Sequence, residues 1–155
     1  MNSFTLVALG GTFDIIHRGH LELLKKGFSI SSKVIIGLTS DEFASKKGKA
    51  PKHNYSQRYK NLKNIIEENF PNSTYEISKL DNDFGPAVLE KEVEALVVSE
   101  ETSSQGVELN RLRAEKKSPP VTVIIVPMVL AGDGMRISST RIKKSEIDPS
   151  GNILN

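Results

Sequence analysis

Cysteine and tryptophan are absent from the 155 residues, and no apolar run is long. Without cysteine the chain has neither a disulfide framework nor a thiolate metal site. No apolar stretch approaches the ~20 residues that span a bilayer, which excludes a transmembrane helix and a membrane partner. The first residues lack a cationic segment followed by an apolar one, so we expect no signal peptide. These absences favour a cytoplasmic location.

An excess of charge of one sign is also lacking. Lysine and arginine number 21 against 19 acidic residues, which gives a net charge of +2. Such a balance is not typical of a general nucleic-acid binder, so we expect no nucleic-acid partner. Hydrophobic residues make up 37% and charged residues 26%, as in a globular domain with a core. We predict a single domain over residues 1–150. A C-terminal tail, 151–155, should follow, because Pro149-Ser150-Gly151-Asn152 resembles the start of a loose chain end.

Apolar runs alternate with segments of helical periodicity along the chain. The predicted strands are 4–9, 33–38, 95–99 and 121–128, with the more polar 74–80 as an edge strand. Three of these runs are almost continuously apolar, which is typical of parallel strands covered on both faces. The predicted helical stripes are Leu21, Leu24 and Phe28, then Tyr55, Tyr59, Leu62 and Ile66, with a further helix within 105–117. The pattern predicts a Rossmann-like α/β fold, a doubly wound parallel sheet of about five strands with helices on both faces.

In a doubly wound sheet, ligands bind beyond the carboxyl ends of the strands. Four segments follow predicted strands there and should face one cleft: 10–20, 39–49, 99–105 and 128–141. The side chains best suited to chemistry fall within these segments.

The first of these segments carries a pair of histidines at the start of a helix. A glycine-bearing turn, 10–14, leads into His17-Arg18-Gly19-His20. A helix start offers free backbone N–H groups and a positive dipole end to an anion. Imidazoles three residues apart converge on the same point, which indicates phosphate chemistry on a nucleotide.

Two alternatives apply to the histidine pair. Each ring could only cap or pack the helix start. A zinc site would need a third ligand, and the only other histidine is His53. It lies at the end of the lysine-rich segment 46–53, called the basic loop below. We therefore assign no metal ligand.

Two motifs together carry a resemblance to a known family. Gly11-Thr12-Phe13-Asp14 precedes His17-x-Gly19-His20, and Ile137-Ser138-Ser139-Thr140-Arg141 lies near the end. In these motifs the chain resembles the HxGH nucleotidyltransferase superfamily. Within this superfamily, the chain is similar to phosphopantetheine adenylyltransferases of the archaeal and eukaryotic type. The supporting segments are Thr39-Ser40-Asp41-Glu42, Lys46-Lys47 and Val98-Ser99-Glu100-Glu101-Thr102.

The resemblance extends from residue 4 to about residue 148. Cytidylyltransferases of the superfamily usually carry an Arg-Thr-x-Gly-Ile-Ser-Thr-Thr segment. Residues 134–140 read Gly-Met-Arg-Ile-Ser-Ser-Thr, without the Thr-x-Gly start. This departure favours adenylyl transfer over cytidylyl transfer.

The resemblance implies an enzyme that joins ATP and 4′-phosphopantetheine, giving dephospho-CoA and pyrophosphate in coenzyme A biosynthesis. The attacking phosphate is already ionised, so the protein must supply alignment and positive charge rather than a strong base. No Asp-rich cage is visible, so Mg²⁺ should be bound through the ATP phosphates. A homo-oligomer is compatible with the sequence.

Two other functions stay open at this point. One is a different reaction of the superfamily, in which a glycerol-phosphate cytidylyltransferase or an FMN or NMN adenylyltransferase uses another acceptor. The other is a nucleotide sensor without catalysis.

The catalytic residues that the resemblance implies are His17, His20 and Lys46. The histidines are hydrogen-bond donors to the triphosphate, and Lys46 contacts the attacking phosphate. Lys47 is a near-equal alternative to Lys46, and a solvated basic loop is the alternative to both.

The expected substrate-binding residues are Gly10, Gly11, Thr12, Phe13, Lys47, Arg58, Ser99, Glu101, Thr102, Ile137, Ser138, Ser139, Thr140 and Arg141. The glycines allow close backbone approach, and Thr12 can bond a phosphate. The 99–102 group should lie beside adenine and ribose, unless it only caps the next helix. The 138–140 hydroxyls should bind phosphate at a helix start, with Arg141 as a bidentate clamp. Arg58 should reach the acceptor phosphate or form a surface ion pair.

Overall fold

The computed structural model describes residues 3–135, 137, 141–142 and 144–154. Its elements in chain order are β1 (Phe4–Gly11), α1 (Arg18–Ile30), β2 (Ser31–Thr39), α2 (Asp41–Lys46), α3 (Tyr55–Asn69), β3 (Tyr75–Leu80), α4 (Pro86–Leu89), β4 (Ala95–Ser99), a 3₁₀ turn η1 (Glu100–Thr102), α5 (Ser104–Glu115) and β5 (Thr122–Val126). No described helix has the length and apolarity needed to cross a membrane.

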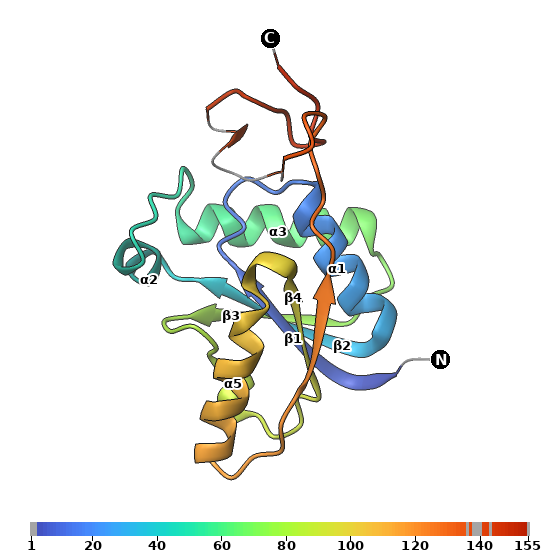
Figure 1. Cartoon of the computed structure of the whole chain (residues 1–155), viewed down its shortest axis with the longest axis vertical. Coiled ribbons are helices and arrows are strands. Elements are labelled where there is room, and N and C mark those ends of the chain that lie inside the picture. Colours follow the sequence, from blue (N-terminus) through green and yellow to red (C-terminus); the bar gives the residue numbers. More distant parts are fainter. Residues whose placement is uncertain (1–2, 136, 138–140, 143, 155) are drawn as a thin grey trace.

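The five strands form one parallel sheet in the order β3-β2-β1-β4-β5 (Figure 1). The predicted Rossmann-like α/β sheet is thus confirmed. The chain winds from β1 to one edge through β2 and β3, then returns to the other side of β1 for β4 and β5. The switch point lies between β1 and β4, where doubly wound sheets open a crevice at the carboxyl ends of their strands.

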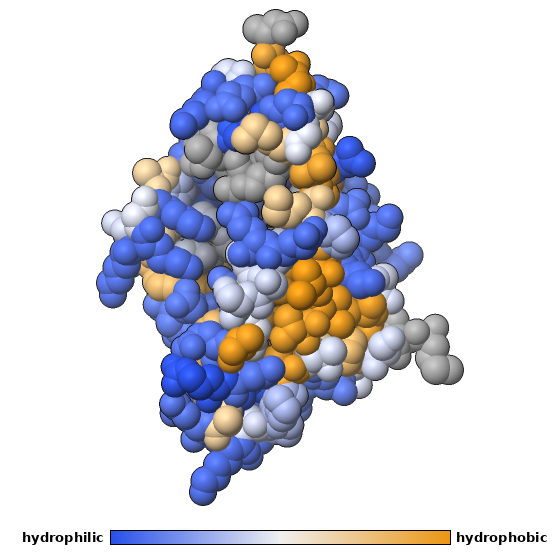
Figure 2. Space-filling view, in the orientation of Figure 1, coloured by the Kyte–Doolittle hydropathy of each residue, from blue (hydrophilic) through white to orange (hydrophobic). Residues whose placement is uncertain are grey.

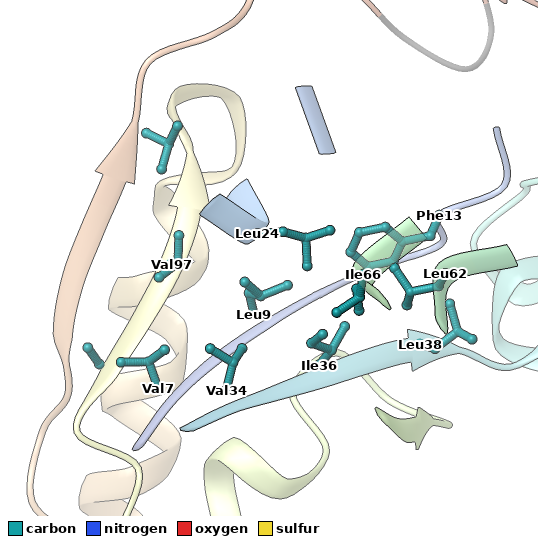
Figure 3. Packing of buried hydrophobic residues seen from close by; sticks show 12 residues of the cluster. Val7, Leu9, Phe13, Leu24, Val34, Ile36, Leu38, Leu62, Ile66 and Val97 are labelled. Carbon is teal, nitrogen blue, oxygen red and sulfur yellow. The ribbon is translucent and has the colours of Figure 1, made fainter. Parts of the chain in front are cut away.

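Successive residues of each strand face opposite sides of the sheet, and each side has its own core. Val7 and Leu9 of β1 pack with α1 and α3, and Figure 3 shows this cluster around Leu24, Leu62 and Ile66. Ala8, between them in sequence, belongs to the second cluster, with α4 and α5. Burial on both sides explains why the central strands are apolar without alternation.

The two edge strands differ from the central ones. β3 is an edge strand, as its polar composition predicts. β5 is shorter than the apolar run 121–128, and Ile125 within it is 51% exposed. The expectation that this run is covered on both faces was wrong at Ile125, because this residue packs in neither of the two core clusters. Figure 2 shows an apolar patch where β5 and α1 lie in Figure 1.

The buried stripe of α3 also differs from the predicted one. Arg58, Leu62 and Ile66 are buried, whereas Tyr59 is 39% exposed. A fully buried arginine thus takes the interior position that the periodicity gave to a tyrosine. The reason lies in the hydrogen bonds of its guanidinium, described below.

The C-terminal segment packs against the body of the molecule. Ala131, Ile137 and Ile147 form a third apolar cluster. Gly151 is buried, turns the chain with φ +90° and accepts a hydrogen bond at its carbonyl from the Gly132 N–H at 2.8 Å. We expected 151–155 to be a loose tail. Residues 151–154 instead fold back, because the positive φ of the glycine lets the chain reverse its direction.

Candidate active site

Two adjoining cavities open at the carboxyl ends of the strands. The larger measures about 770 Å³ and the smaller about 150 Å³. They share a wall formed by Gly10, Gly11, Thr12, Leu23, Lys49, Ser99 and Thr102. Each of the four segments expected at the cleft contributes lining residues. The topology therefore places the predicted site at the switch point of the sheet.

Both histidines line the larger cavity and form a reciprocal cap at the start of α1. The Nδ1 atom of His17 accepts a hydrogen bond from the Gly19 N–H at 3.1 Å. The Nδ1 atom of His20 accepts one from the His17 N–H at 3.2 Å. Because each Nδ1 is an acceptor, the proton of each neutral ring resides on Nε2. Capping and ligand binding thus use opposite nitrogens, so the capping alternative does not exclude the donor role.

The geometry of this cap explains the spacing of the HxGH motif. The two imidazole rings stack with centroids 3.9 Å apart. A Cβ at Gly19 would lie 2.9 Å from Cε1 of His17, so a side chain there would displace the ring. The glycine between the histidines is therefore required by the folded-back ring of His17.

His20 is held in its neutral form. Burial, followed by the neighbouring His17 and Lys49, lowers its pKa from 6.5 to about 3. At neutral pH the ring carries no charge and has an Nε2–H donor.

The backbone amides at this helix start are less available than expected. The Arg18 N–H donates to the carbonyl of Pro149 at 3.0 Å, and the Gly19 N–H is used by His17. The expectation of free N–H groups was wrong for these two, because the C-terminal segment and the His17 ring dock on them. The imidazole Nε2–H groups and the helix dipole can attract an anion at this helix start.

Phe13 turns the chain from the strand toward the helix. Its φ of +49° is uncommon for a residue with a side chain. The ring is buried in the core near Leu62 and Ile66 (Figure 3), and its centroid lies 4.9 Å from that of His20. A Cβ at Gly11 would lie 3.2 Å from this ring, which accounts for the glycine before the turn. The side chain of Phe13 therefore supports His20 from the core side.

The structure distinguishes the lysines of the basic loop. Lys46 ends α2, is exposed and lines neither cavity. Lys47 forms an ion pair with Asp83 at 2.9 Å and lines only the smaller cavity. Lys49 lines both, and its Nζ lies 3.3 Å from Oγ1 of Thr12.

Sequence reasoning missed Lys49. Gly48, with φ +75°, redirects the chain after α2, and Lys49 beyond it lines both cavities although it is exposed, as Lys46 and Lys47 are. Burial is the main cause of the lowered pKa of Lys49, with the charge of Lys47 second. A glycine after a short helix was the available signal for this turn.

Arg58 is fully buried and connects four segments around the site. Its guanidinium donates to the carbonyls of Thr12 at 2.9 Å, Thr39 at 2.8 Å and His53 at 3.0 Å. It also pairs with the carboxylate of Asp41 at 2.8 Å. The alternative of a surface ion pair was therefore wrong, because the side chain is inside the protein. These contacts fix the turn that carries Thr12, and Arg58 lines neither cavity, so its expected contact with the acceptor phosphate stays a prediction.

Asp14 anchors the basic loop to the same turn, a role that sequence reasoning missed. The carboxylate is buried and accepts hydrogen bonds from the N–H groups of Lys52 at 2.8 Å and His53 at 3.0 Å. The ring nitrogen Nδ1 of His53 lies 3.2 Å from the same carboxylate. Because Arg58 holds the carbonyl of His53, both ends of this contact are fixed. The position of Lys49 relative to Thr12 follows from this network.

The residues expected to contact the nucleotide line the cavities. Ser99 and Thr102 line both cavities, with their hydroxyl oxygens 3.1 Å apart. The N-cap of α5 is Ser103, and Ser99 is the N-cap of η1 without a cap hydrogen bond from its side chain, so the hydroxyls of Ser99 and Thr102 cap neither helix. Glu101 and the buried Ile137 line the larger cavity.

The late motif is described only in part. Ser138, Ser139 and Thr140 lie outside the described residues. Arg141 pairs with Asp133 and with Glu146, the latter at 3.2 Å. Among the cations of this segment that the structure describes, Lys144 lines the larger cavity and Arg141 does not. Within the described ranges, no group of three or more His, Asp or Glu side chains could hold a metal ion.

Known proteins are similar to this chain over nearly its whole length. Residues 8–145 match the cytidylyltransferase-like family. A phosphopantetheine adenylyltransferase from Methanothermobacter thermautotrophicus is 42% identical over 97% of this chain and 90% of its own length. One from Methanosarcina barkeri is 44% identical over 95% of this chain and 91% of its own.

Solved structures resemble the fold. A protein of unknown function from Archaeoglobus fulgidus has a TM-score of 0.70 and 29% identity, covering 79% of this chain and 89% of its own. A pantothenate synthetase from Thermus thermophilus, with a TM-score of 0.58, 15% identity and coverage of 92% and 62%, shares the fold alone. On the extent of the family match and the identity to these relatives, the chain belongs to the cytidylyltransferase-like nucleotidyltransferases, in the branch of the phosphopantetheine adenylyltransferases.

Proposed function

We propose that this protein transfers the adenylyl group of ATP to 4′-phosphopantetheine, producing dephospho-CoA and pyrophosphate in coenzyme A biosynthesis. One observation carries the proposal. Two cavities of different size meet at Thr12 and Lys49, beside two imidazoles that present Nε2–H donors. A reaction that joins two substrates through phosphate needs such a junction.

The larger cavity suits the nucleotide. Its volume of about 770 Å³ lies in the range of small-molecule sites, and both histidines and Lys144 line it. The smaller cavity suits the arm of the acceptor. Apolar side chains of Leu80, Phe84 and Ala87 line it, and Lys49 stands where it joins the larger one.

The chemistry follows from this placement. A phosphate oxygen of the acceptor attacks the α-phosphorus of ATP, a new P–O bond forms, and the bond to pyrophosphate breaks. Negative charge increases on the oxygens around the α- and β-phosphorus atoms. The Nε2–H groups of His17 and His20 and the ammonium of Lys49 stabilise this charge, and no general base is required.

Magnesium enters as part of the ATP complex. The described part of the chain offers no carboxylate cluster for a resident ion. The phosphates and water would hold Mg²⁺, which would offset charge on the leaving pyrophosphate.

Incubation with ATP or CTP and a panel of acceptors tests the proposal. With Mg²⁺, we expect pyrophosphate release from ATP with 4′-phosphopantetheine, and much less with CTP. Dephosphorylated pantetheine should fail, because it lacks the nucleophilic phosphate and leaves Lys49 unpaired.

Preference for CTP with glycerol phosphate, or for ATP with FMN or NMN, would move the protein to another branch of the superfamily. Nucleotide binding without pyrophosphate release from any acceptor would make it a sensor and contradict the proposal.

A further inference from the structure

A second buried arginine lies outside the reacting groups. Arg113 on α5 is fully buried, like Arg58. Its guanidinium donates to five main-chain carbonyls, those of Ala87 at 2.6 Å, Glu90 at 3.0 Å, Lys91 at 3.4 Å, Val93 at 3.1 Å and Pro119 at 2.7 Å. Burial lowers the pKa of this group. A desolvated cation is costly unless its donors are bonded, so the chain uses this charge to fix one segment.

The fixed segment is α4 and the chain that follows it. Ala87 lies within α4, Glu90 directly follows the helix, and Val93 precedes β4. A helix of four residues is not stable alone, because it has hardly passed nucleation. A cation at the carbonyl end of a helix satisfies the last acceptors and complements the dipole. Arg113 therefore supplies the stabilisation that α4 lacks.

α4 forms part of the wall of the smaller cavity. Ala87, whose carbonyl Arg113 holds, lines that cavity together with Phe84. Both residues also pack in the core cluster that contains Leu96 and Leu109. The larger cavity has neither Phe84 nor Ala87 in its lining. A shift of α4 should thus change one cavity and leave the other unchanged.

We propose that Arg113 is a positioning residue for acceptor recognition, which holds α4 in the conformation that the arm of the acceptor contacts. The proposal rests on the proposed function, since it takes the smaller cavity as the acceptor site. Lysine cannot replace this arginine, because one ammonium with three donors cannot span five carbonyls.

The test is Arg113→Lys in the whole protein, with steady-state kinetics for each substrate. We expect the KM for 4′-phosphopantetheine to rise about 10-fold, while kcat and the KM for ATP change by less than about 2-fold. The matched control is Arg111→Lys on the same helix. Arg111 is exposed and pairs with Glu108 and Glu115, so its variant should match the parent in all three constants.

A second variant leaves the buried charge in place. Ala87→Gly weakens α4, because glycine has a lower helix propensity than alanine. It should raise the KM for the acceptor in the same selective way, by about 3-fold. If Arg113→Lys does not fold, this variant still tests the step on which the inference depends, that α4 controls acceptor binding, and an unchanged KM for the acceptor would overturn the inference.

The outcomes separate the two proposals. If the parent protein shows no transfer to 4′-phosphopantetheine, the proposed function fails. If the parent is active but the variants raise both KM values equally, or neither, Arg113 is a structural residue only and the inference is overturned.

Discussion

Replacing His20 with alanine lowers kcat by at least about 100-fold. Loss of one preorganised donor to a developing oxyanion has a typical effect of ~10²–10³ on the rate. The structure adds a complication, because Nδ1 of His20 also caps the His17 N–H. The alanine variant therefore loses a cap and a donor together, and steady-state kinetics on this variant alone cannot separate them.

Two further substitutions at the same position separate these roles. In His20→Asn, the side-chain oxygen can take the place of Nδ1 as a cap, but no donor reaches the Nε2 position. In His20→Gln, the amide nitrogen can approach the Nε2 position while the cap is lost. We expect the glutamine variant to retain more turnover than the asparagine variant. The opposite order, with both variants folded, would make His20 a capping residue only.

The pH dependence of stability gives a second readout for His20. Its folded-state pKa of about 3 is below its ordinary value of 6.5, so the unfolded chain binds this proton first as the pH falls. The free energy of unfolding of the parent should therefore decrease as pH falls from 6.5 toward 3. His20→Ala should lack this contribution, so its decrease over that interval, measured by denaturant titration, should be smaller. Equal decreases would mean that the ring is not held neutral.

Lys49→Ala has the second large expected effect. The ammonium lies at the junction of the two cavities, 3.3 Å from the Thr12 hydroxyl, where it can follow charge on the transferred group. We expect kcat to fall by about 100-fold and the KM for ATP to change by less than about 3-fold, since the interaction strengthens in the transition state. Stopped-time assays of pyrophosphate release over a range of ATP concentrations measure both constants.

Lys46→Ala is the matched control for this prediction. Lys46 is the last residue of α2 and lines neither cavity. Its loss should therefore change kcat by less than about 2-fold. A large loss for Lys46→Ala with a small one for Lys49→Ala would restore the assignment favoured by the sequence. Small effects in both variants would mean that the loop is a solvated basic segment.

The fold was predictable because its signals are local and repeated. The buried strands β2 and β4 contain almost continuous apolar runs, and the polar strand 75–80 lies at an edge as its composition predicts. The positions of Gly10, Thr12 and the two histidines at the cleft follow from the rule that parallel strands end at the same edge.

The remaining features depend on contacts between distant residues, which periodicity does not carry. Nothing local in the sequence shows that Arg58 would satisfy the carbonyls of Thr12 and Thr39, so Tyr59 was given its interior place. Whether Lys46 or Lys49 reaches the cavities depends on the turn at Gly48 and on Asp14. The carboxylate of Asp14 accepts a hydrogen bond from the Lys52 N–H, 38 residues later in the chain. The docking of Pro149 on the Arg18 amide likewise depends on the whole fold.

Following an ¹⁸O label into the products tests most directly whether the acceptor phosphate attacks the α-phosphorus of ATP. 4′-Phosphopantetheine with ¹⁸O in its phosphate oxygens is incubated with unlabelled ATP and Mg²⁺, and the products are analysed by mass spectrometry. Attack of the acceptor phosphate on the α-phosphorus predicts dephospho-CoA that retains all of the label and pyrophosphate that contains none. Label in pyrophosphate, or ADP or phosphate in place of pyrophosphate, would contradict the account.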